Sequence, residues 1–435
     1  MTLPVLAWSN PVDLLSASAA TGGAGDAVTS SCIGADCVYF NPGRLCLGQD
    51  PRLAIGATAQ YASLAVPGGS QNIFEPFYTH VSAVAPPFGG GLKDRLWVGV
   101  LLSAPGGEIS RVRIHTPTEP FYPYYDNRSQ RLLILPGLSL RVLDSPHIGR
   151  IGFGLGFNYF AGLNGGIAAA EGATRAMEAR VSLELAGLVG LIVGAAWERG
   201  PWAAGITYRQ AFGVDFHTLA FNHVAGTDIN MELLATALYS PHTLQWGASY
   251  IFGRQKLQID IIEQLWSFYD GPFVQIDSMM PMVGALSGQI PPNRFRNTVG
   301  LRTSWQMEVS NFILRAGVGF DPSFIATPQT GVTNLLDAHK LLLSAGFSWK
   351  FSKDLVLHAF SRAHILIPVT HHKKRIETVC GNEIPDDSPS ALYDELACDP
   401  DDASTHGFQT SNPGYPSITA SGFVLMGGLT LEVLP

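Results

Sequence analysis

The stretch KLLLSAGFSWKFSKDLVLHAF, residues 340–360, decides the fold, because large apolar residues take every second position along it. Its odd positions are Leu341, Leu343, Ala345, Phe347, Trp349 and Phe351. The positions between them are mainly Ser, Gly and Lys, with Leu342 as the exception, and the alternation resumes after the short segment 352–354. A period of two is typical of a strand with one apolar face. That face meets either a protein core or lipid.

The same alternation recurs along much of the chain, for example in 132–142, 151–159, 243–252, 312–320 and 422–434. The second face of these segments carries Gly, Ser, Asn and occasional Arg, whereas a soluble β-sandwich would show Lys, Glu and Thr to water. This composition favours a crowded lumen with the apolar face in lipid. The alternative is that the aromatic residues fill a large soluble β core. Aromatic residues near strand ends predict an interfacial girdle: Trp97, Tyr159, Trp197, Trp202, Tyr208, Tyr250, Trp305 and Trp349.

The composition agrees with a membrane barrel. Charged residues are 14% of the 435 residues, against about 25% in an average soluble protein. The chain has 47 glycines and 10% aromatic residues, and its longest uncharged apolar run, 185–197, is too short for a membrane helix of about 20 residues. A net charge of −8 argues against nucleic acid as a partner. We therefore expect an all-β fold, a transmembrane antiparallel β-barrel.

The segments after about residue 52 predict 14 strands, with 16 as the alternative count. Short connections, at 145–147 and 352–354, alternate with the long segments 105–130, 269–294 and 366–417. Short turns on one side and long loops on the other are typical of outer-membrane barrels. Two of the long segments, with the motifs PTEPFYPYYDN and FVQIDSMMPMVGALSGQIPP, are rich in aromatic residues, Met and Pro, and are interpreted as an apolar capture surface.

Several motifs follow one another in a familiar order. Gly22-Gly23-Ala24-Gly25 precedes Phe40-Asn41-Pro42 in the non-alternating start of the chain. The motifs LWVGVLLSAPGG, LQIDIIEQLWSF and FILRAGVGFDPS come later. In these motifs the chain resembles the FadL/TodX family of outer-membrane transporters for hydrophobic compounds. It departs from the family at Gly43-Arg44, where Ala and Gly are usual, and in its end, TLEVLP, which lacks a terminal aromatic residue.

The resemblance implies a domain organisation and a function. Residues 1–48 would form a hatch inside the lumen of a barrel made by residues 49–435. The protein would be a monomer in the outer membrane of a Gram-negative cell, in contact with lipid and lipopolysaccharide. It would pass long-chain fatty acids or other hydrophobic molecules, aromatic compounds included, by passive uptake through ligand capture, hatch movement and lateral exit. No enzymatic activity, cofactor or metal is expected.

Two short segments are candidates for moving parts. Asn41 and Pro42 belong to the hatch in this resemblance and are expected to open the path by a small shift, although Asn-Pro is also a common turn. Pro105, Gly106 and Gly107 are candidates for a kink that opens the wall, since Pro lacks an N–H and Gly tolerates bends. An ordinary strand end is the alternative for this second segment.

Five basic residues fall on the expected lumenal face: Arg141, Arg302, Arg315, His358 and Arg362. A cation there can hold the carboxylate of a ligand. The alternative is that these residues pair with acidic residues of the plug or barrel, such as Asp260.

The five cysteines suggest an oxidising compartment. Cys32 and Cys37 lie close together, Cys380 and Cys398 bracket an acidic segment, and each pair is a disulfide candidate that leaves Cys46 unpaired. The opening MTLPVLAWSN lacks the basic residues of a complete signal peptide. It is compatible with the tail of a presequence.

Three other functions are alternatives to transport. An outer-membrane lipid hydrolase needs a Ser, a His and an acid at one rim, and no spacing selects such a set. A general porin for polar solutes and a soluble all-β binding protein are further alternatives. The motif THHKKR, 370–375, is interpreted as a solvated loop rather than a metal site, because adjacent histidines on an extended segment point to opposite sides.

Overall fold

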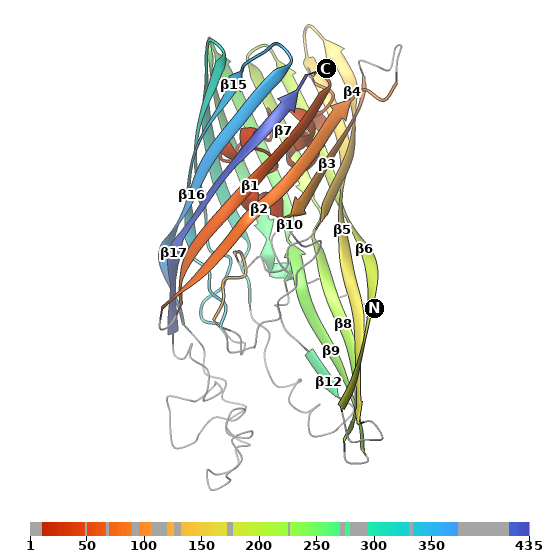
Figure 1. Cartoon of the computed structure of the whole chain (residues 1–435). Helices are drawn as coiled ribbons and strands as arrows, with labels where there is room; N and C mark the ends of the chain where they lie inside the picture. The colour runs from red at the N-terminus through yellow and green to blue at the C-terminus, as the bar shows by residue number, and fades with distance from the viewer. Residues whose placement is uncertain are drawn as a thin grey trace.

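A computed structural model describes most of the chain. The described residues are 11–47, 50–66, 69–88, 95–106, 120–125, 132–171, 177–224, 227–269, 275–278, 294–329, 334–372 and 417–434. Over these residues the strands form one sheet of seventeen strands. Figure 1 shows that most of this sheet is rolled into a barrel with steeply tilted strands.

Fourteen of the strands close the barrel. β1 (Arg52–Val66) pairs antiparallel with both β2 (Gly69–Ala85) and β17 (Ser417–Val433), so the wall has no free edge between the first and last strands. The expected count of 14 is confirmed and the alternative of 16 is wrong for the described residues. The remaining barrel strands are β3 (Leu96–Pro105), β4 (Leu133–Ser145), β5 (Gly149–Glu171), β6 (Met177–Arg199), β7 (Trp202–Arg209), β10 (His242–Phe252), β11 (Gln255–Leu265), β13 (Thr298–Val309), β14 (Phe312–Asp321), β15 (His339–Lys350) and β16 (Leu355–His372).

Three further strands extend the wall on one side, at the lower right of Figure 1. β8 (Phe212–Val224) pairs with β9 (Thr227–Ser240), and β12 (Gln275–Ser278) adds to β9. β8 also pairs in parallel with the far end of β5, over Ile167–Ala170. Thus β5 and β6 continue beyond the barrel into a projecting sheet.

The two ends of the barrel differ. At the upper end in Figure 1 the strands are joined by short turns, such as 200–201 between β6 and β7, 253–254 between β10 and β11, and 310–311 between β13 and β14. The longer connections, which include 106–132 and 373–416, leave from the other end. In outer-membrane barrels the short turns are periplasmic. We call the two ends the short-turn end and the long-loop end.

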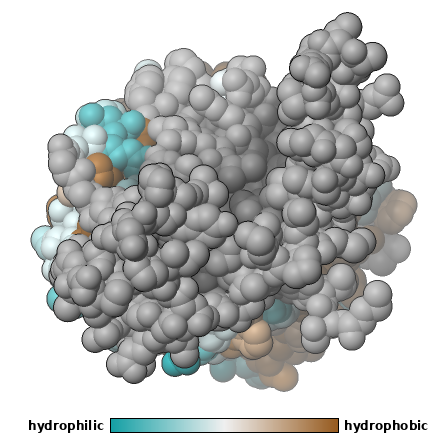
Figure 2. Space-filling model, turned by 90° about the horizontal axis from the view of Figure 1, so that it is seen from below, coloured by the Kyte–Doolittle hydropathy of each residue, from teal (hydrophilic) through white to brown (hydrophobic). Residues whose placement is uncertain are grey.

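The outward side of the wall is apolar, as the alternation predicts. In β15, Leu343, Phe347 and Trp349 are 40–42% exposed, whereas Leu342 is 1% exposed and faces the lumen. Apolar residues are visible on parts of the flank in the end-on view of Figure 2. A closed barrel that exposes such residues along its strands is built to meet lipid with its outer face.

One girdle residue is placed differently from the expectation. Trp97 of β3 is 7% exposed and packs in the core cluster that includes Val38 and Leu45 of the N-terminal segment. β3 is apolar on both faces around this position, so the sequence pattern alone does not fix its inward phase. Trp202, Tyr250 and Trp349, by contrast, are 38–55% exposed.

Residues 11–47, here called the N-terminal segment, lie inside the barrel towards its short-turn end (Figure 1). They form short helices separated by bends, and Ser16, Gly25 and Asp26 adopt positive φ there. The side chain of Ser18 caps the start of α2. None of the helices in the described part of the chain is long and apolar enough to span a membrane. These elements are α1 (Pro11–Leu15), α2 (Ala19–Gly23), η1 (Gly34–Asp36), α3 (Cys37–Phe40) and η2 (Pro42–Arg44), and one further turn, η4 (Trp266–Phe268), follows β11.

Candidate functional site

The Asn41-Pro42 pair is buried between the N-terminal segment and the wall. Asn41 is 0% exposed, and its side-chain oxygen accepts a hydrogen bond from the backbone N–H of Gly43 at 3.1 Å. The same amide donates to the carbonyl oxygens of Thr29 at 2.9 Å and Ala195 of β6 at 3.0 Å. Asn41 therefore forms a local turn and also binds the N-terminal segment to the wall.

Glycines of three adjacent strands form the surface on which this turn rests. A Cβ on Gly154 of β5 would lie 2.6 Å from the backbone nitrogen of Gly43, and one on Gly194 of β6 would lie 2.7 Å from Cδ of Pro42. At Gly205 of β7 a Cβ would lie 2.6 Å from the Thr29 carbonyl oxygen. Only glycine permits such close backbone approach. The small inward residues that marked the lumen in the sequence thus provide the contact surface for the N-terminal segment.

A buried ion cluster joins the N-terminal segment to the opposite part of the wall. The carboxylate of Asp26, which is 0% exposed, lies 2.8 Å from Arg362 of β16 and 3.7 Å from Arg302 of β13. Ser16 donates to the same carboxylate at 2.5 Å, and Arg302 also bonds Asp321 at 3.0 Å. Both guanidinium groups are therefore neutralised by carboxylates of the protein. Removing one member of a buried pair leaves an uncompensated charge.

From the sequence, Asp260 is a possible partner for the lumenal arginines, but the structure gives it other partners. It lies opposite Arg302 in the ladder between β11 and β13. Its carboxylate accepts hydrogen bonds from the backbone N–H of Thr29 at 2.9 Å, the Thr29 hydroxyl at 2.7 Å and the Gln245 amide at 3.1 Å. Asp26, not Asp260, is the acidic residue of the N-terminal segment that pairs with Arg302 and Arg362.

Arg315 and His358 meet at another point of the lumen. The Arg315 guanidinium donates to the hydroxyl of Ser348, and that hydroxyl lies 2.6 Å from Nδ1 of His358. Nε2 of His358 is 3.9 Å from the carboxylate of Glu432. Arg141 lies apart from this group, near the short-turn end, where it pairs with Asp144 at 3.4 Å. The five basic candidates thus form two separate groups and one isolated pair.

The structure describes three of the five cysteines and two of the three residues that are candidates for a kink in the wall. Cys32 and Cys37 form a disulfide with a Cα–Cα distance of 5.3 Å, and Cys46 is buried and free. Pro105 is the last residue of β3 and lies opposite Tyr78 of β2, and Gly106 follows as an exposed bend. The candidates outside the described residues are Gly107, Cys380 and Cys398.

A cluster of aromatic residues lies towards the long-loop end from the N-terminal segment. Trp266 stacks on Phe324 with ring centroids 4.1 Å apart, and Tyr269 stacks on Phe295 at 4.0 Å. Lys340 lies 4.6 Å from the ring centroid of Tyr124. The cluster is continuous with Leu14 and Leu15 of the N-terminal segment. We use the name aromatic cluster for the eight ring residues of this core that lie outside the barrel strands: Phe121, Tyr122, Tyr124, Tyr125, Trp266, Tyr269, Phe295 and Phe324.

The aromatic cluster corrects the expectation for the motif PTEPFYPYYDN. The four aromatic residues of 121–125 are at most 6% exposed, so in this state they are not a capture surface. Tyr122 donates to the Ala65 carbonyl oxygen at 2.6 Å and accepts from the Ser421 N–H at 2.9 Å. Residues 121–125 are therefore folded into the lumen, and Tyr122 binds them to β1 and β17. The Pro and Tyr content signalled an apolar segment, but not the side on which it packs.

The two histidines at the end of β16 lie in different surroundings. His371 is buried and bonds the Asp337 carbonyl oxygen at 2.6 Å, whereas His372 is exposed. The two side chains point to opposite sides, as expected, although His371 is not solvated. No group of three or more His, Cys, Asp or Glu with metal-binding geometry occurs in the part of the chain that the structure describes.

The ion cluster generates a test of what holds the N-terminal segment in place. Asp26→Asn leaves Arg362 and Arg302 without their shared carboxylate, and we expect the seated state to lose about 3–5 kcal/mol. The measurement is conductance of the purified protein in planar bilayers, where unseating appears as increased ion leak. Asp144→Asn is the control, because the partly exposed Arg141–Asp144 pair contributes at most about 1 kcal/mol. Equal leak in both variants would contradict the assignment.

We expect Asp36 to make the stability of the packed N-terminal segment dependent on pH. Burial raises the pKa of its carboxyl to about 7, with a further rise from nearby Glu432 and Asp26 and an opposing hydrogen bond from Ser18. Because the folded pKa is above the ordinary value, stability is fully present at low pH and falls as pH rises towards 7. We expect less leak at pH 5 than at pH 8. Asp36→Asn should remove most of this difference; an unchanged difference would exclude Asp36 as its source.

Comparison with known proteins gives structural relatives only. No protein-family model and no curated protein matches the sequence. Among solved structures, a Pseudomonas aeruginosa FadL homologue matches with a TM-score of 0.61 and 12% identity over 99% of both chains. The Pseudomonas putida toluene transporter TodX matches with a TM-score of 0.53 and 11% identity, over 99% of this chain and 100% of its own. A TodX deltaS2S3 mutant, described as a monoaromatic hydrocarbon channel, matches with 0.56 and 13%, over 97% and 100%.

At such low identity the matches concern the fold. They extend over nearly the whole length of both chains, so the resemblance seen in the sequence motifs is confirmed at the level of architecture. The chain has the fold of the FadL and TodX outer-membrane proteins: a closed fourteen-stranded transmembrane barrel.

Proposed function

We propose that the protein is an outer-membrane channel for passive uptake of hydrophobic small molecules, with the N-terminal segment as its hatch. The observation that carries the proposal is the filling of the lumen. The N-terminal segment and the aromatic cluster pack against each other inside a wall that is closed around them. A general porin instead holds a water-filled lumen.

The interior suits an apolar ligand better than a polar one. The aromatic cluster offers stacked rings, which bind flat or chain-like apolar molecules through burial and dispersion. The buried cation nearest to it, Lys340, is paired with Asp337 at 2.7 Å. A ligand carboxylate would have to replace that partner. We propose long-chain fatty acids and monoaromatic compounds as the substrate classes; the second class is in keeping with the names toluene transporter and monoaromatic hydrocarbon channel, which two structural relatives carry.

A test of the ligand site uses Trp266, whose ring stacks on Phe324. Trp266→Ala removes a large ring from the aromatic cluster, and we expect about tenfold weaker retention of radiolabelled oleate or toluene by detergent-purified protein. Trp349→Ala, on the lipid side and 42% exposed, is the matched control. Organic extraction followed by mass spectrometry identifies whatever co-purifies. Steady ion conductance by the unmodified protein, with no apolar ligand bound, would contradict the proposal in favour of a porin.

We propose that the ligand leaves sideways, next to the end of β3. A lateral exit keeps an apolar molecule out of water on its way to the membrane. The ladder between β2 and β3 begins at Tyr78 and Pro105, and Pro105 has no N–H to donate. The exposed bend at Gly106 follows directly. A local opening of β3 from β2 at this point would break few backbone hydrogen bonds.

A cross-link tests this exit. Thr79 and Ala104 are register partners across β2 and β3, so Thr79→Cys with Ala104→Cys places a disulfide between these strands. We expect oxidation to abolish uptake of labelled oleate by proteoliposomes, and reduction to restore it. Ala57→Cys with Leu429→Cys, partners across β1 and β17, is the control that should transport in both states. Full uptake with β2 and β3 cross-linked would place the exit elsewhere.

The hydrolase alternative has one observation in its favour, the Ser348, His358 and Glu432 group. Its geometry is poor for catalysis: the 3.9 Å between His358 and Glu432 is too long for a hydrogen bond, and the Ser348 hydroxyl also accepts a hydrogen bond from Arg315. Ser348 is 0% exposed. The group is better explained as part of the polar lining of the lumen. Ester hydrolysis that Ser348→Ala abolishes would reverse this interpretation.

A further inference from the structure

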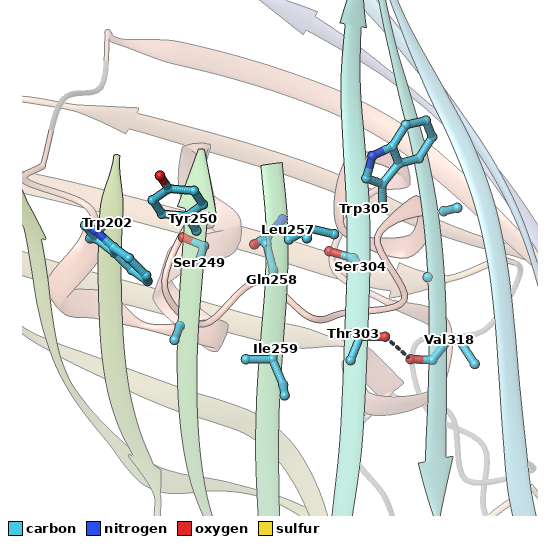
Figure 3. A pocket seen from close by; sticks show the side chains of 13 residues that line it. Trp202, Ser249, Tyr250, Leu257, Gln258, Ile259, Thr303, Ser304, Trp305 and Val318 are labelled. Carbon is cyan, nitrogen blue, oxygen red and sulfur yellow. Dashed lines mark hydrogen bonds between the residues drawn. The ribbon is translucent and has the colours of Figure 1, made fainter. Parts of the chain in front are cut away.

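An apolar groove crosses the outer surface of the barrel over β7, β10, β11, β13 and β14. Its volume is about 530 Å³, within the range of about 300–1,000 Å³ that is usual for small-molecule sites. Figure 3 shows Trp202 and Tyr250 on one side of it and Trp305 on the other, with Leu257 and Ile259 of β11 between them.

The groove arises from small residues on the lipid-facing side. Ala248, Thr303 and Ala316 occupy outward positions where most other strands carry Leu, Ile, Val or Phe. The ladders bring them together, because Ile259 lies opposite both Ala248 and Thr303. Thr303 donates its hydroxyl proton to the Val318 carbonyl oxygen at 3.5 Å (Figure 3), which occupies its polar atom. The bottom of the groove is therefore formed by small side chains without a free polar group.

Aromatic rings form rigid sides to this floor. Trp202 and Tyr250 are in contact, with ring centroids 4.3 Å apart, and both are at least 38% exposed. On the other side Trp305 donates from Nε1 to the side-chain oxygen of Gln255 at 2.8 Å, which fixes the indole. Trp202 directly follows the turn 200–201, so these rings lie near the short-turn end. Trp and Tyr at such positions mark the membrane interface.

The occupant of the groove must come from the membrane. The ladders from β10 to β14 are continuous across this region, and the N-terminal segment packs directly behind it. A Cβ on Gly247 would lie 2.6 Å from Thr29, and one on Gly317 would lie 2.8 Å from Ala24. The wall here is therefore closed, with the N-terminal segment packed against its inner side, and the groove does not connect to the lumen.

The adjacent turn supplies a positive charge. Arg254 is exposed in the turn that joins β10 to β11, the two strands at the middle of the groove. In the chain this turn lies between Tyr250 and Leu257, which both line the groove, so it continues the groove towards the short-turn end. A guanidinium group in such a turn can bind the phosphate at the end of an acyl chain. We propose that the groove binds one acyl chain of a phospholipid from the leaflet on the short-turn side, with the lipid phosphate at Arg254.

Native mass spectrometry of the full-length protein, released from nanodiscs of defined phosphatidylethanolamine, tests this proposal. The unmodified protein should retain one phospholipid. The double variant Ala248→Trp and Ala316→Trp fills the groove and should lose the adduct, and Arg254→Gln should lower its occupancy several-fold. Ala363→Trp on β16 is the control, since its register partners Leu343 and Leu425 face outward on a part of the wall outside the groove, and it should keep the adduct.

Three results would overturn the proposal. These are an adduct that persists in the double variant, an equal loss in the Ala363→Trp control, and retention of a free fatty acid in place of the phospholipid. Heat-modifiable migration on a gel checks that each variant folds. If the double variant fails that check, Ala248→Trp and Ala316→Trp are measured singly, and each must reduce the adduct at least several-fold. None of these outcomes depends on whether the lumen transports a ligand.

Discussion

The pairing of β1 with β17 is the constraint on which the rest of the structure depends. In the hydrocarbon of a membrane every backbone N–H and C=O must find a partner within the protein, so a spanning sheet has to close. Closure here joins residues 53–64 to residues 422–433, almost the full length of the chain apart. Once the wall is closed, each strand has one face towards lipid and one towards the lumen. The period of two in the sequence corresponds to these two faces.

A closed wall of fourteen strands encloses more space than its own side chains fill. Gly154, Gly194 and Gly205 leave room for the backbone of the N-terminal segment at one side of the lumen. These glycines allow the N-terminal segment to approach the wall closely, but they do not fix where along the wall it lies. The position of the segment is therefore fixed by polar contacts, among them those of Asp26, Asn41 and Asp260. Buried charges seldom increase stability over apolar packing, but they penalise any displacement that separates them. These contacts therefore favour a single position of the N-terminal segment in the lumen.

The sequence predicted the wall better than its contents. Strand phase is a local property, and in β15 and β16 the alternation of Leu343, Phe347 and His358 placed each side chain on the correct side. The predicted outward orientation of Trp97 was wrong, because β3 is apolar on both faces and its inward face is covered by the N-terminal segment. The segment around Tyr124 was expected at the surface. Its burial depends on strands and loops far away in the sequence, so no local pattern contains it.

By itself the sequence determined the class of fold and the lipid-facing surface, because both follow from residue period and composition, and it left the number of strands between 14 and 16. It also marked Asn41-Pro42 and the lumenal arginines as unusual, without naming their partners. Only the tertiary structure decided that Asp26 neutralises Arg302 and Arg362, and that the residues of the aromatic cluster pack together inside the barrel. It also decided that three small outward residues meet in one groove. The physical reason is that these contacts join residues brought together by barrel closure, whereas strand phase is set by neighbours along the chain.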